Sequence, residues 1–398
     1  MPRSIWLLVI GMAVSITGSS FLWPLNAIYI HDHLGKTLTV AGVVLLLNQA
    51  ASVLGNLVGG AIFDKLGGYR SMLLGVSISL FAAVGLFFWH GWPHYVYLLI
   101  ILGFGSGIII PAMYAMAGSV WPEGGRKAFN ALYVAQNLGV AIGSALGGFV
   151  AAYRFDYTFM ANALLFIMFF LIAVIGYRTI QVQTVDISTS VIKNAGPVKN
   201  YTKLTALLIL CFGYMLCWIG YVQWQSTIAT YTQDLSISLE QYSLLWTVNG
   251  ALIVLAQPLL AMVVKVLKSI KLQIVVGMII FIISFLMVGT ADEYAGFLSA
   301  MIILTFGEML VWPAVPTIAH SLAPKGREGF YQGIVNSTAT CGRMLGPLFG
   351  GIMVDQYGME VLFIALVILC VIGIFTTLLY DRKLKKTEVQ HSSMSANV

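Results

Sequence analysis

The chain is dominated by apolar stretches, each about as long as a helix that crosses a membrane. A helix needs about 20 mostly apolar residues to span the hydrocarbon core of a bilayer, and about twelve segments of the sequence meet this requirement. Because 59% of the residues are hydrophobic and only 9% are charged, most of the surface must face lipid instead of water. The sequence therefore predicts an all-α integral membrane protein. The expected spans lie near residues 5–30, 39–63, 71–90, 95–121, 128–152, 157–178, 204–230, 242–264, 272–290, 295–321, 329–354 and 359–380.

The first apolar stretch also has features of a secretory signal. Arg3 precedes an apolar run, and small residues follow at 18–20, as at a cleavage site. The apolar character continues past these residues to Ile30. We therefore interpret the stretch as a first spanning helix.

One polar segment, 179–203, divides the predicted spans into two groups of six. It is rich in Gln, Ser, Thr and Lys, whereas the other gaps are short, so we interpret it as a linker. We expect an N-terminal six-helix bundle at 1–178, a cytoplasmic linker at 179–203, a C-terminal six-helix bundle at 204–381 and a cytoplasmic tail at 382–398.

The distribution of positive charge predicts the orientation. Basic residues in short loops favour the cytoplasmic side of a membrane. With a cytoplasmic N-terminus, the 21 Lys and Arg residues all fall on the cytoplasmic side except Lys36, Arg154 and Arg343. We therefore expect both termini in the cytoplasm. Topology and attraction to anionic lipid account for the net charge of +6, so the charge does not indicate a nucleic-acid partner.

The two halves of the sequence repeat each other. The run Phe104-Gly105-Ser106 in the fourth span recurs 202 residues later as Phe306-Gly307-Glu308 in the tenth. Six spans per repeat preserve orientation, so the halves should be parallel repeats with a substrate path between them. Glycine rows that allow close helix packing recur in the fifth and eleventh spans at Gly139, Gly143, Gly147 and Gly148, and at Gly342, Gly346, Gly350 and Gly351.

With these features the chain resembles the major facilitator superfamily. The segment after the second span, 60–70, is similar to the cytoplasmic loop signature of that superfamily. Its matching positions are Gly60, Asp64, Lys65, Gly67 and Arg70. The resemblance implies that Asp64 acts as a latch, in which an acid meets a helix N-terminus across the halves and holds the cytoplasmic side closed; the alternative is a solvated loop acid. Gly68 replaces the usual basic residue, which weakens the transfer of the signature's charge relay.

A second motif points to one branch of that superfamily. The run Gly342-x3-Gly346-Pro347-x2-Gly350-Gly351 is similar to the glycine-proline motif of drug:proton antiporters, although the family places this motif in the fifth span, where the present chain has Ser144 in place of the proline. The fourth-span arginine often linked to proton coupling is missing at 98–103. The chain resembles in this respect the twelve-span multidrug exporters of Gram-positive bacteria.

Two ionisable side chains, Glu308 and Arg343, fall near the middle of predicted spans. Such residues are costly in a membrane and mark functional sites. We expect Glu308 to carry a proton and to attract cationic groups of the substrate, because burial favours a neutral carboxyl and a nearby cation favours the ionised form. The alternative is an ion pair between Glu308 and Arg343 that fixes two helices. Polar and aromatic candidates for a cavity lining are Asn26, Gln49, Gln136, Gln225, Asn249 and Trp312.

These features favour a secondary active transporter that exports hydrophobic or cationic small molecules in exchange for protons. The alternative is a permease for a specific metabolite such as a sugar, an amino acid or a lipid precursor. Catalytic clusters and nucleotide-binding motifs are missing from the sequence, so we expect no enzyme activity, no metal and no cofactor. The expected partners are a small-molecule substrate, protons and the lipid bilayer. We expect a monomer with several spans in the plasma membrane of a bacterium.

Overall fold

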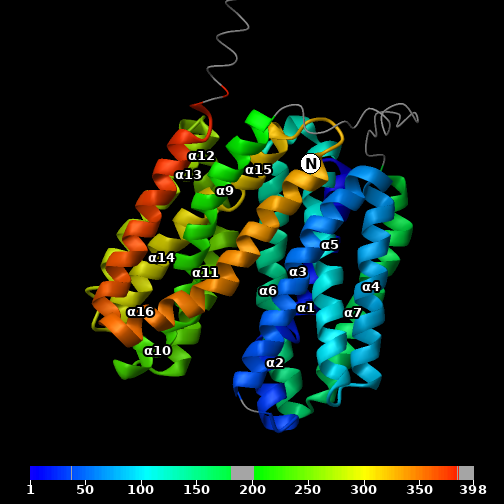
Figure 1. Ribbon diagram of the computed structural model, residues 1–398, viewed down its shortest axis with the longest axis horizontal. Helices are drawn as coiled ribbons and strands as arrows, with labels where there is room; N and C mark the ends of the chain where they lie inside the picture. The colour runs from blue at the N-terminus through cyan, green and yellow to red at the C-terminus, as the bar shows by residue number, and fades with distance from the viewer. Residues whose placement is uncertain (37, 181–200, 383, 385–398) are drawn as a thin grey trace, which may run out of the picture. The chain divides into compact units, whose positions relative to one another are not determined.

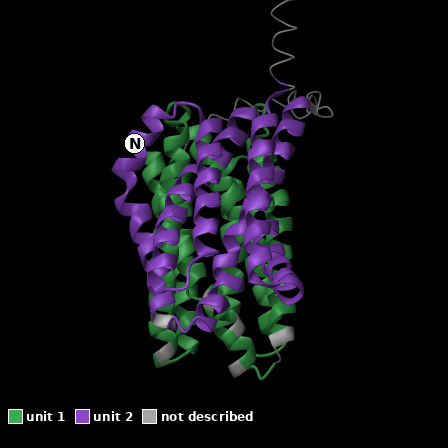
Figure 2. Cartoon of the chain, turned by 90° about the vertical axis from the view of Figure 1, so that its left-hand side faces the viewer, with its two compact units in different colours: residues 1–186, 324–340 green, residues 187–323, 341–398 purple. Residues whose placement is uncertain are grey.

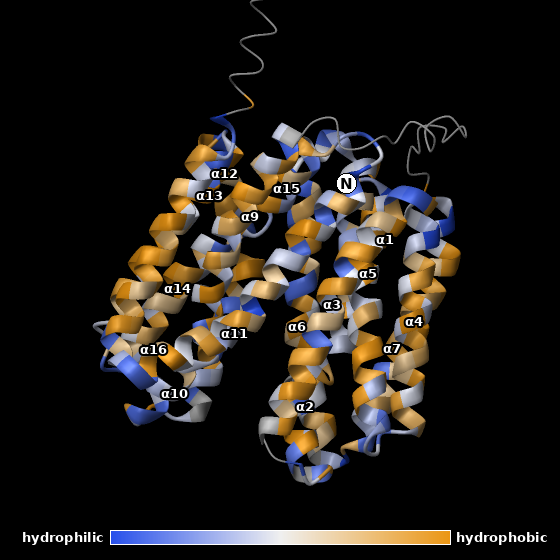
Figure 3. Cartoon of the chain, viewed as in Figure 1, coloured by the Kyte–Doolittle hydropathy of each residue, from blue (hydrophilic) through white to orange (hydrophobic). Residues whose placement is uncertain are grey.

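The computed structural model describes residues 1–36, 38–180, 201–382 and 384. The described residues are almost entirely helical, and apolar residues run along most of the helices (Figures 1 and 3). Most of the predicted linker, 181–200, and most of the predicted tail lie outside the described residues. By their internal contacts the helices form two compact units (Figure 2), unit 1 with residues 1–186 and 324–340, and unit 2 with residues 187–323 and 341–398.

Unit 1 contains six long helices and the start of a seventh. The six are α1 (Arg3–Ser20), α3 (Leu38–Leu66), α4 (Gly68–Phe88), α5 (His94–Val120), α6 (Arg126–Tyr153) and α7 (Asp156–Gly176). Unit 2 contains α9 (Tyr201–Tyr221), α10 (Thr227–Asp234), α11 (Leu239–Leu255), α12 (Gln257–Val266), α13 (Ile270–Val288), α14 (Tyr294–Val311) and α15 (Ala314–Leu322). The last helix, α16 (Glu328–Leu379), contributes to both units.

The number of spans confirms the predicted fold class. Ten of the described helical segments are long and apolar enough to cross a membrane, and the bent pair α11 and α12 makes an eleventh. The 52-residue helix α16 is broken at Gly358, where φ is 82°. Its two parts are each long enough to span, so the described residues contain about twelve spans.

Three predicted spans are less regular than the sequence suggested. The first helix ends at Ser20, and short helical turns continue to His33. The eighth bends by 61° between α11 and α12, where Pro258 lacks the N–H that a straight helix needs. The tenth is interrupted between α14 and α15, at Trp312 and Pro313, for the same reason.

The internal repeat is visible in the packing of matched helices. A Cβ atom on Gly105 of α5 would lie 3.1 Å from the carbonyl oxygen of Gly75 in α4. In unit 2, a Cβ atom on Gly307 of α14 would lie 2.9 Å from the carbonyl oxygen of Gly277 in α13. Both partners in the second pair lie 202 residues after their counterparts in the first. The two units therefore share a helix crossing that only glycine permits.

The two glycine rows pack in the same matched way. A Cβ atom on Gly139 of α6 would lie 2.8 Å from the carbonyl oxygen of Ala13 in α1. A Cβ atom on Gly342 of α16 would lie 2.8 Å from the carbonyl oxygen of Met215 in α9. Each row therefore lies against the first long helix of its own unit. The rows continue along the same contacts at Gly143, Gly147, Gly346 and Gly350.

Other members of the glycine motifs do not pack closely. A Cβ atom on Gly148 or Gly351 would meet nothing within 4 Å. Pro347 lies on the exposed side of α16. The close packing of each row thus belongs to one face of the helix.

Candidate functional site

Glu308 lies at the centre of unit 2, in the middle of the span formed by α14 and α15. Its side chain is only 1% exposed. The amide nitrogen of Asn249, in α11, donates a hydrogen bond of 2.6 Å to the Glu308 carboxylate. The same nitrogen donates to the Thr305 hydroxyl at 2.9 Å. A buried carboxylate without donors would be strongly unfavourable, so Asn249 makes an acid tolerable at this depth.

Tyr221 is a second hydrogen-bond partner of this carboxylate. Its hydroxyl, at the end of α9, donates to Glu308, so three helices supply the acid and its two donors. The amide and hydroxyl groups can each donate or accept. The set can therefore satisfy Glu308 both as a carboxylate and as a protonated acid, as a proton-binding site requires.

An aromatic cluster surrounds this polar centre. The rings of Trp218 and Trp312 stack with centroids 4.3 Å apart and an interplanar angle of 7°. Tyr214 and Tyr221 each approach Trp312 edge-on at 5.5 Å. Such rings exclude water and present electron-rich faces, so this region of unit 2 suits flat apolar or cationic groups.

Arg343 is half-buried and lies against the same cluster. Its guanidinium group is 4.7 Å from the centroid of the Trp218 ring, a cation–π contact. The described contacts thus join Arg343 to Trp218 and Glu308 to Asn249. The ion pair between Glu308 and Arg343 stays a prediction.

Asp64 forms a second polar site, within unit 1. Its two carboxylate oxygens accept hydrogen bonds from the backbone N–H groups of Gly329, at 2.8 Å, and Phe330, at 2.9 Å. These groups belong to the first turn of α16, where unpaired N–H groups and the helix dipole favour an anion. The carboxylate therefore joins the end of α3 to the start of α16.

Close backbone packing accompanies this contact. A Cβ atom on Gly60 would overlap the carbonyl oxygen of Gly329, and one on Gly333 would overlap that of Asn56. Farther along, the Ser337 hydroxyl donates to the carbonyl oxygen of Val53 at 3.2 Å. The first turns of α16 thus lie directly on α3 over several turns.

The other residues of the predicted loop signature shape the turn after α3. Gly67 has a φ of 81°, a conformation that favours glycine, and it precedes α4. Lys65 and Arg70 are exposed. Gly68 is buried, and a Cβ atom there would lie 2.8 Å from the Met116 side chain, so packing accounts for glycine at this position.

The predicted cavity residues are spread over both units. Asn26 is buried and accepts a hydrogen bond of 2.7 Å from the Tyr95 hydroxyl, and Gln136 accepts one of 3.4 Å from Tyr114. Gln49 is half-buried in α3, and Gln225 is exposed at the end of a short turn after α9. Only Asn249 and Trp312 lie in the region around Glu308.

Three residues of this region, Tyr221, Thr305 and Trp218, were not singled out from the sequence. Tyrosines, threonines and tryptophans are common in spans as packing or interface residues, so their types alone carried no signal. A comparison at the repeat offset would have marked them, because their counterparts in unit 1 are Ser19, Gly103 and Ile16. Within the described residues, no group of three or more His, Cys, Asp or Glu could hold a metal ion.

Twelve spans arranged as two repeats, with a hydrogen-bonded acid in the membrane interior, define a class: multi-pass membrane transporters. The sequence profile of the Major Facilitator Superfamily matches residues 8–339 and 210–395. The chain belongs to this superfamily, which confirms the resemblance to it.

Relatives and solved structures agree with this membership. The chain is 60% identical over 396 residues, 99% of each chain, to "Uncharacterized MFS-type transporter YttB" of Bacillus subtilis (strain 168). It is 23% identical over 362 residues to the multidrug resistance protein MdtH of Shigella dysenteriae serotype 1 (strain Sd197), covering 88% of this chain and 86% of that protein. The human organic anion transporter MFSD10 (TETRAN) shares the fold, with a TM-score of 0.72 at 15% identity, covering 95% of this chain and 100% of that one. A POT family transporter in complex with 5-aminolevulinic acid shares it too, with a TM-score of 0.70 at 16% identity and 95% coverage of both chains.

Proposed function

We propose that this transporter exports hydrophobic or cationic small molecules in exchange for protons, by alternating access. The observation that carries the proposal is the buried carboxylate of Glu308 with its partners Asn249 and Tyr221. The amide of Asn249 and the hydroxyl of Tyr221 can each donate or accept a hydrogen bond. The carboxyl group of Glu308 can therefore gain and lose a proton without leaving a buried polar atom unsatisfied. In this proposal a proton and a cationic substrate compete for Glu308.

The aromatic cluster supports the proposed substrate class. Trp218 and Trp312 offer flat apolar faces, which favour aromatic or cationic compounds through stacking and cation–π contacts. The similarity to the multidrug resistance protein MdtH points in the same direction.

Asp64 supports alternating access. We propose that its hydrogen bonds to Gly329 and Phe330 hold α3 against α16 in one state and break in the other. In the orientation predicted from the basic residues, these bonds close the cytoplasmic side. The plasma membrane of a bacterium, with both termini in the cytoplasm, is the proposed location.

A flux measurement in lipid vesicles that contain the purified protein tests the proposal. Purified protein is reconstituted, a panel of cationic and neutral dyes is added, and dye uptake is followed together with proton release. The wild type should exchange protons for at least one cationic dye. The variant Glu308→Gln should lose this exchange, because the amide cannot carry a proton.

The control is Ser106→Ala, at the matched position of unit 1. It should keep the exchange at the wild-type ratio of protons to dye. Unchanged coupling in Glu308→Gln, at equal amounts of folded protein, would refute the role of this acid.

One observation favours the alternative, a permease for a metabolite with an anionic group. Arg343 places a positive charge against the Trp218 ring, and an arginine beside aromatic faces suits a carboxylate on a flat or apolar body. The protein MFSD10 (TETRAN), an organic anion transporter, shares the fold. The same vesicles distinguish the two functions. The permease would be favoured if the wild type accumulates carboxylic acids but does not transport cationic dyes, and if Arg343→Gln abolishes the accumulation.

A further inference from the structure

Unit 2 contains a cavity whose lining includes neither Glu308 nor the polar and aromatic residues that contact it. It is an apolar groove of about 420 Å³ between α12, α13 and α14. All nine side chains that line it are apolar, and each of the three helices contributes, for example through Val263, Ile280 and Phe306. The volume falls in the range of about 300–1,000 Å³ that is typical of small-molecule sites.

The groove has a cause in the path of the chain. Because of the 61° bend between α11 and α12, α12 does not continue the packing of α11. Within α12, all of which is described, Leu260 is the one buried residue. The gap beside this helix is therefore a consequence of the bend near Pro258.

Two lysines lie at the end of the groove where α12 leads into α13. Lys265 is in the last turn of α12, and Lys268 is in the connection to α13. Both are exposed, and the ammonium group of neither makes a hydrogen bond or an ion pair within the described part of the chain. Lys271 differs, because its ammonium group donates to Asp381 at 2.6 Å. The free positive charge at this end therefore comes from Lys265 and Lys268.

The groove and the lysines have the spacing of a phospholipid. At a rise of 1.5 Å per residue, Val276 and Ile283 lie about 9 and 20 Å from the start of α13. Half of the hydrocarbon core is about 15 Å thick. A lipid whose headgroup lies beside Lys268 would thus place an acyl chain along the groove.

We infer that this groove is a binding site for an anionic phospholipid, with an acyl chain between α12, α13 and α14 and the phosphate group beside Lys265 and Lys268. Bilayer lipid covers any membrane protein, so the site is distinguished by its preference for anionic over zwitterionic lipid. The lysines attract the negative headgroup, and the apolar groove accommodates the acyl chain.

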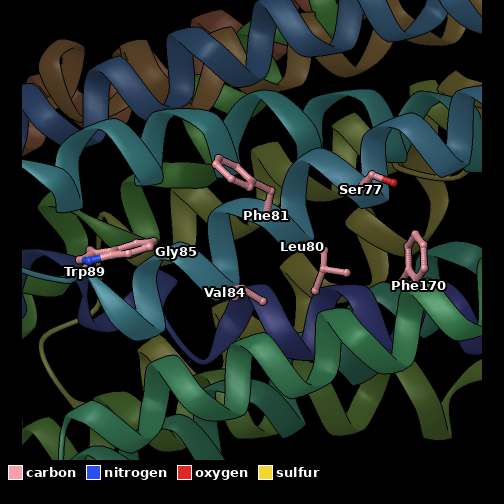
Figure 4. A pocket seen from close by; sticks show the side chains of 7 residues that line it. All are labelled: Ser77, Leu80, Phe81, Val84, Gly85, Trp89 and Phe170. Atoms are coloured by element: carbon pink, nitrogen blue, oxygen red, sulfur yellow. The ribbon is translucent and has the colours of Figure 1, made fainter.

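A groove in unit 1 provides the contrast. It has a volume of about 360 Å³, and its lining includes Leu80, Val84 and Trp89 from the region of α4 and Phe170 from α7 (Figure 4). The lysine of the neighbouring loop region, Lys36, lies over the ring of Trp92, 4.8 Å from its centroid. We therefore expect no preference for anionic lipid at this groove. Filling it controls for the effect of occupying an apolar surface.

The test measures lipid binding to the purified full-length protein. Phosphatidylglycerol and phosphatidylcholine are titrated in detergent, and bound lipid is counted by native mass spectrometry, with the shift in melting temperature as a second readout. The wild type should retain phosphatidylglycerol preferentially. The double variant Lys265→Gln/Lys268→Gln should bind it about thirtyfold more weakly, because each lysine near a membrane contributes about fivefold. Ile280→Trp, which fills the groove, should also remove the preference.

Two matched variants control for charge and for volume. Lys127→Gln/Lys325→Gln removes the same charge from exposed positions of unit 1, and Val84→Trp fills the groove of unit 1. Both should keep the wild-type preference. The inference is overturned if the variants of unit 2 retain the preference, or if all four variants lose it equally.

Discussion

The centres of the two units differ although the helix crossings around them match. Gly105 and Gly307 make the same close approach in α5 and α14. One residue further on, unit 1 has Ser106 and unit 2 has Glu308. The amide of Asn249 donates to Thr305 and Glu308 of α14, whereas that of Asn48 in α3 donates to the carbonyl oxygen of Leu99 in α5 and lies beside Gly103, the counterpart of Thr305. The repeat therefore conserves the scaffold and places the ionisable chemistry in one copy.

The opposite asymmetry holds at the other polar site. Asp64 of unit 1 has no acidic counterpart in unit 2, because residues 257–270 contain neither Asp nor Glu. The helix that carries Asp64, α3, runs unbroken for 29 residues, whereas its counterpart is bent into α11 and α12. Unit 1 thus has the straight helix and the bond to α16, and unit 2 has the acid and the aromatic cluster. The two units therefore share a fold but differ in their polar sites, and the predictions below test whether they also differ in function.

The largest effect is expected when the acid of unit 2 loses its amide donor. Asn249→Leu removes the amide donor and leaves a buried carboxylate less satisfied, at a cost of about 1–3 kcal/mol. Proton-coupled transport should fall about 5- to 150-fold, measured as dye flux per folded transporter. The control is Asn48→Leu, the same change in unit 1, where the amide donates to the carbonyl oxygen of Leu99. Equal losses in the two variants would show that the difference between the centres has no functional meaning.

A smaller effect is expected at Asp64. Asp64→Asn removes the negative charge at the start of α16 and turns a donor toward its N–H groups. The loss is about 1–2 kcal/mol, equivalent to a factor of about 5–30 in the ratio of the two states. Transport should fall while the amount of protein in the membrane stays the same, as measured by flux and quantitative blotting.

The matched control for this prediction is Val266→Asn. It introduces the same side chain at an exposed position at the end of α12 in unit 2 and should leave transport unchanged. A wild-type rate in Asp64→Asn would mean that the bond to α16 does not limit transport.

The smallest effects distinguish the two faces of the glycine rows. Gly350→Ala would overlap the Gln223 side chain and should cost about 1–3 kcal/mol. Gly351→Ala meets open space and should change stability by less than about 0.5 kcal/mol. The pair Gly147 and Gly148 in unit 1 should behave in the same order, measured by melting temperature in detergent. If the second glycine of either pair were the more sensitive one, the two glycine rows would not pack in the same way.

Hydropathy predicted the spans well, because about 20 apolar residues have few alternatives to a membrane helix. The breaks were not predicted: a proline such as Pro258 interrupts a helix only if neighbouring helices accept the bend. Glu308 was predicted to be functional because an ionisable side chain is costly in a membrane. Its partner Asn249 was predicted only as a residue that lines a cavity. Pairing two residues 59 positions apart depends on how helices pack, which the periodicity of one sequence does not determine.

The bond between Asp64 and α16 has a genetic consequence. The acceptor is a side chain, but both donors are backbone N–H groups. No side-chain substitution at Phe330 other than proline removes its donor, whereas any residue without a carboxylate at position 64 lacks at least one of the two acceptor oxygens. In a saturation mutagenesis screen, position 64 should therefore tolerate almost nothing, while position 330 should vary freely and reveal its part only through the intolerance of proline.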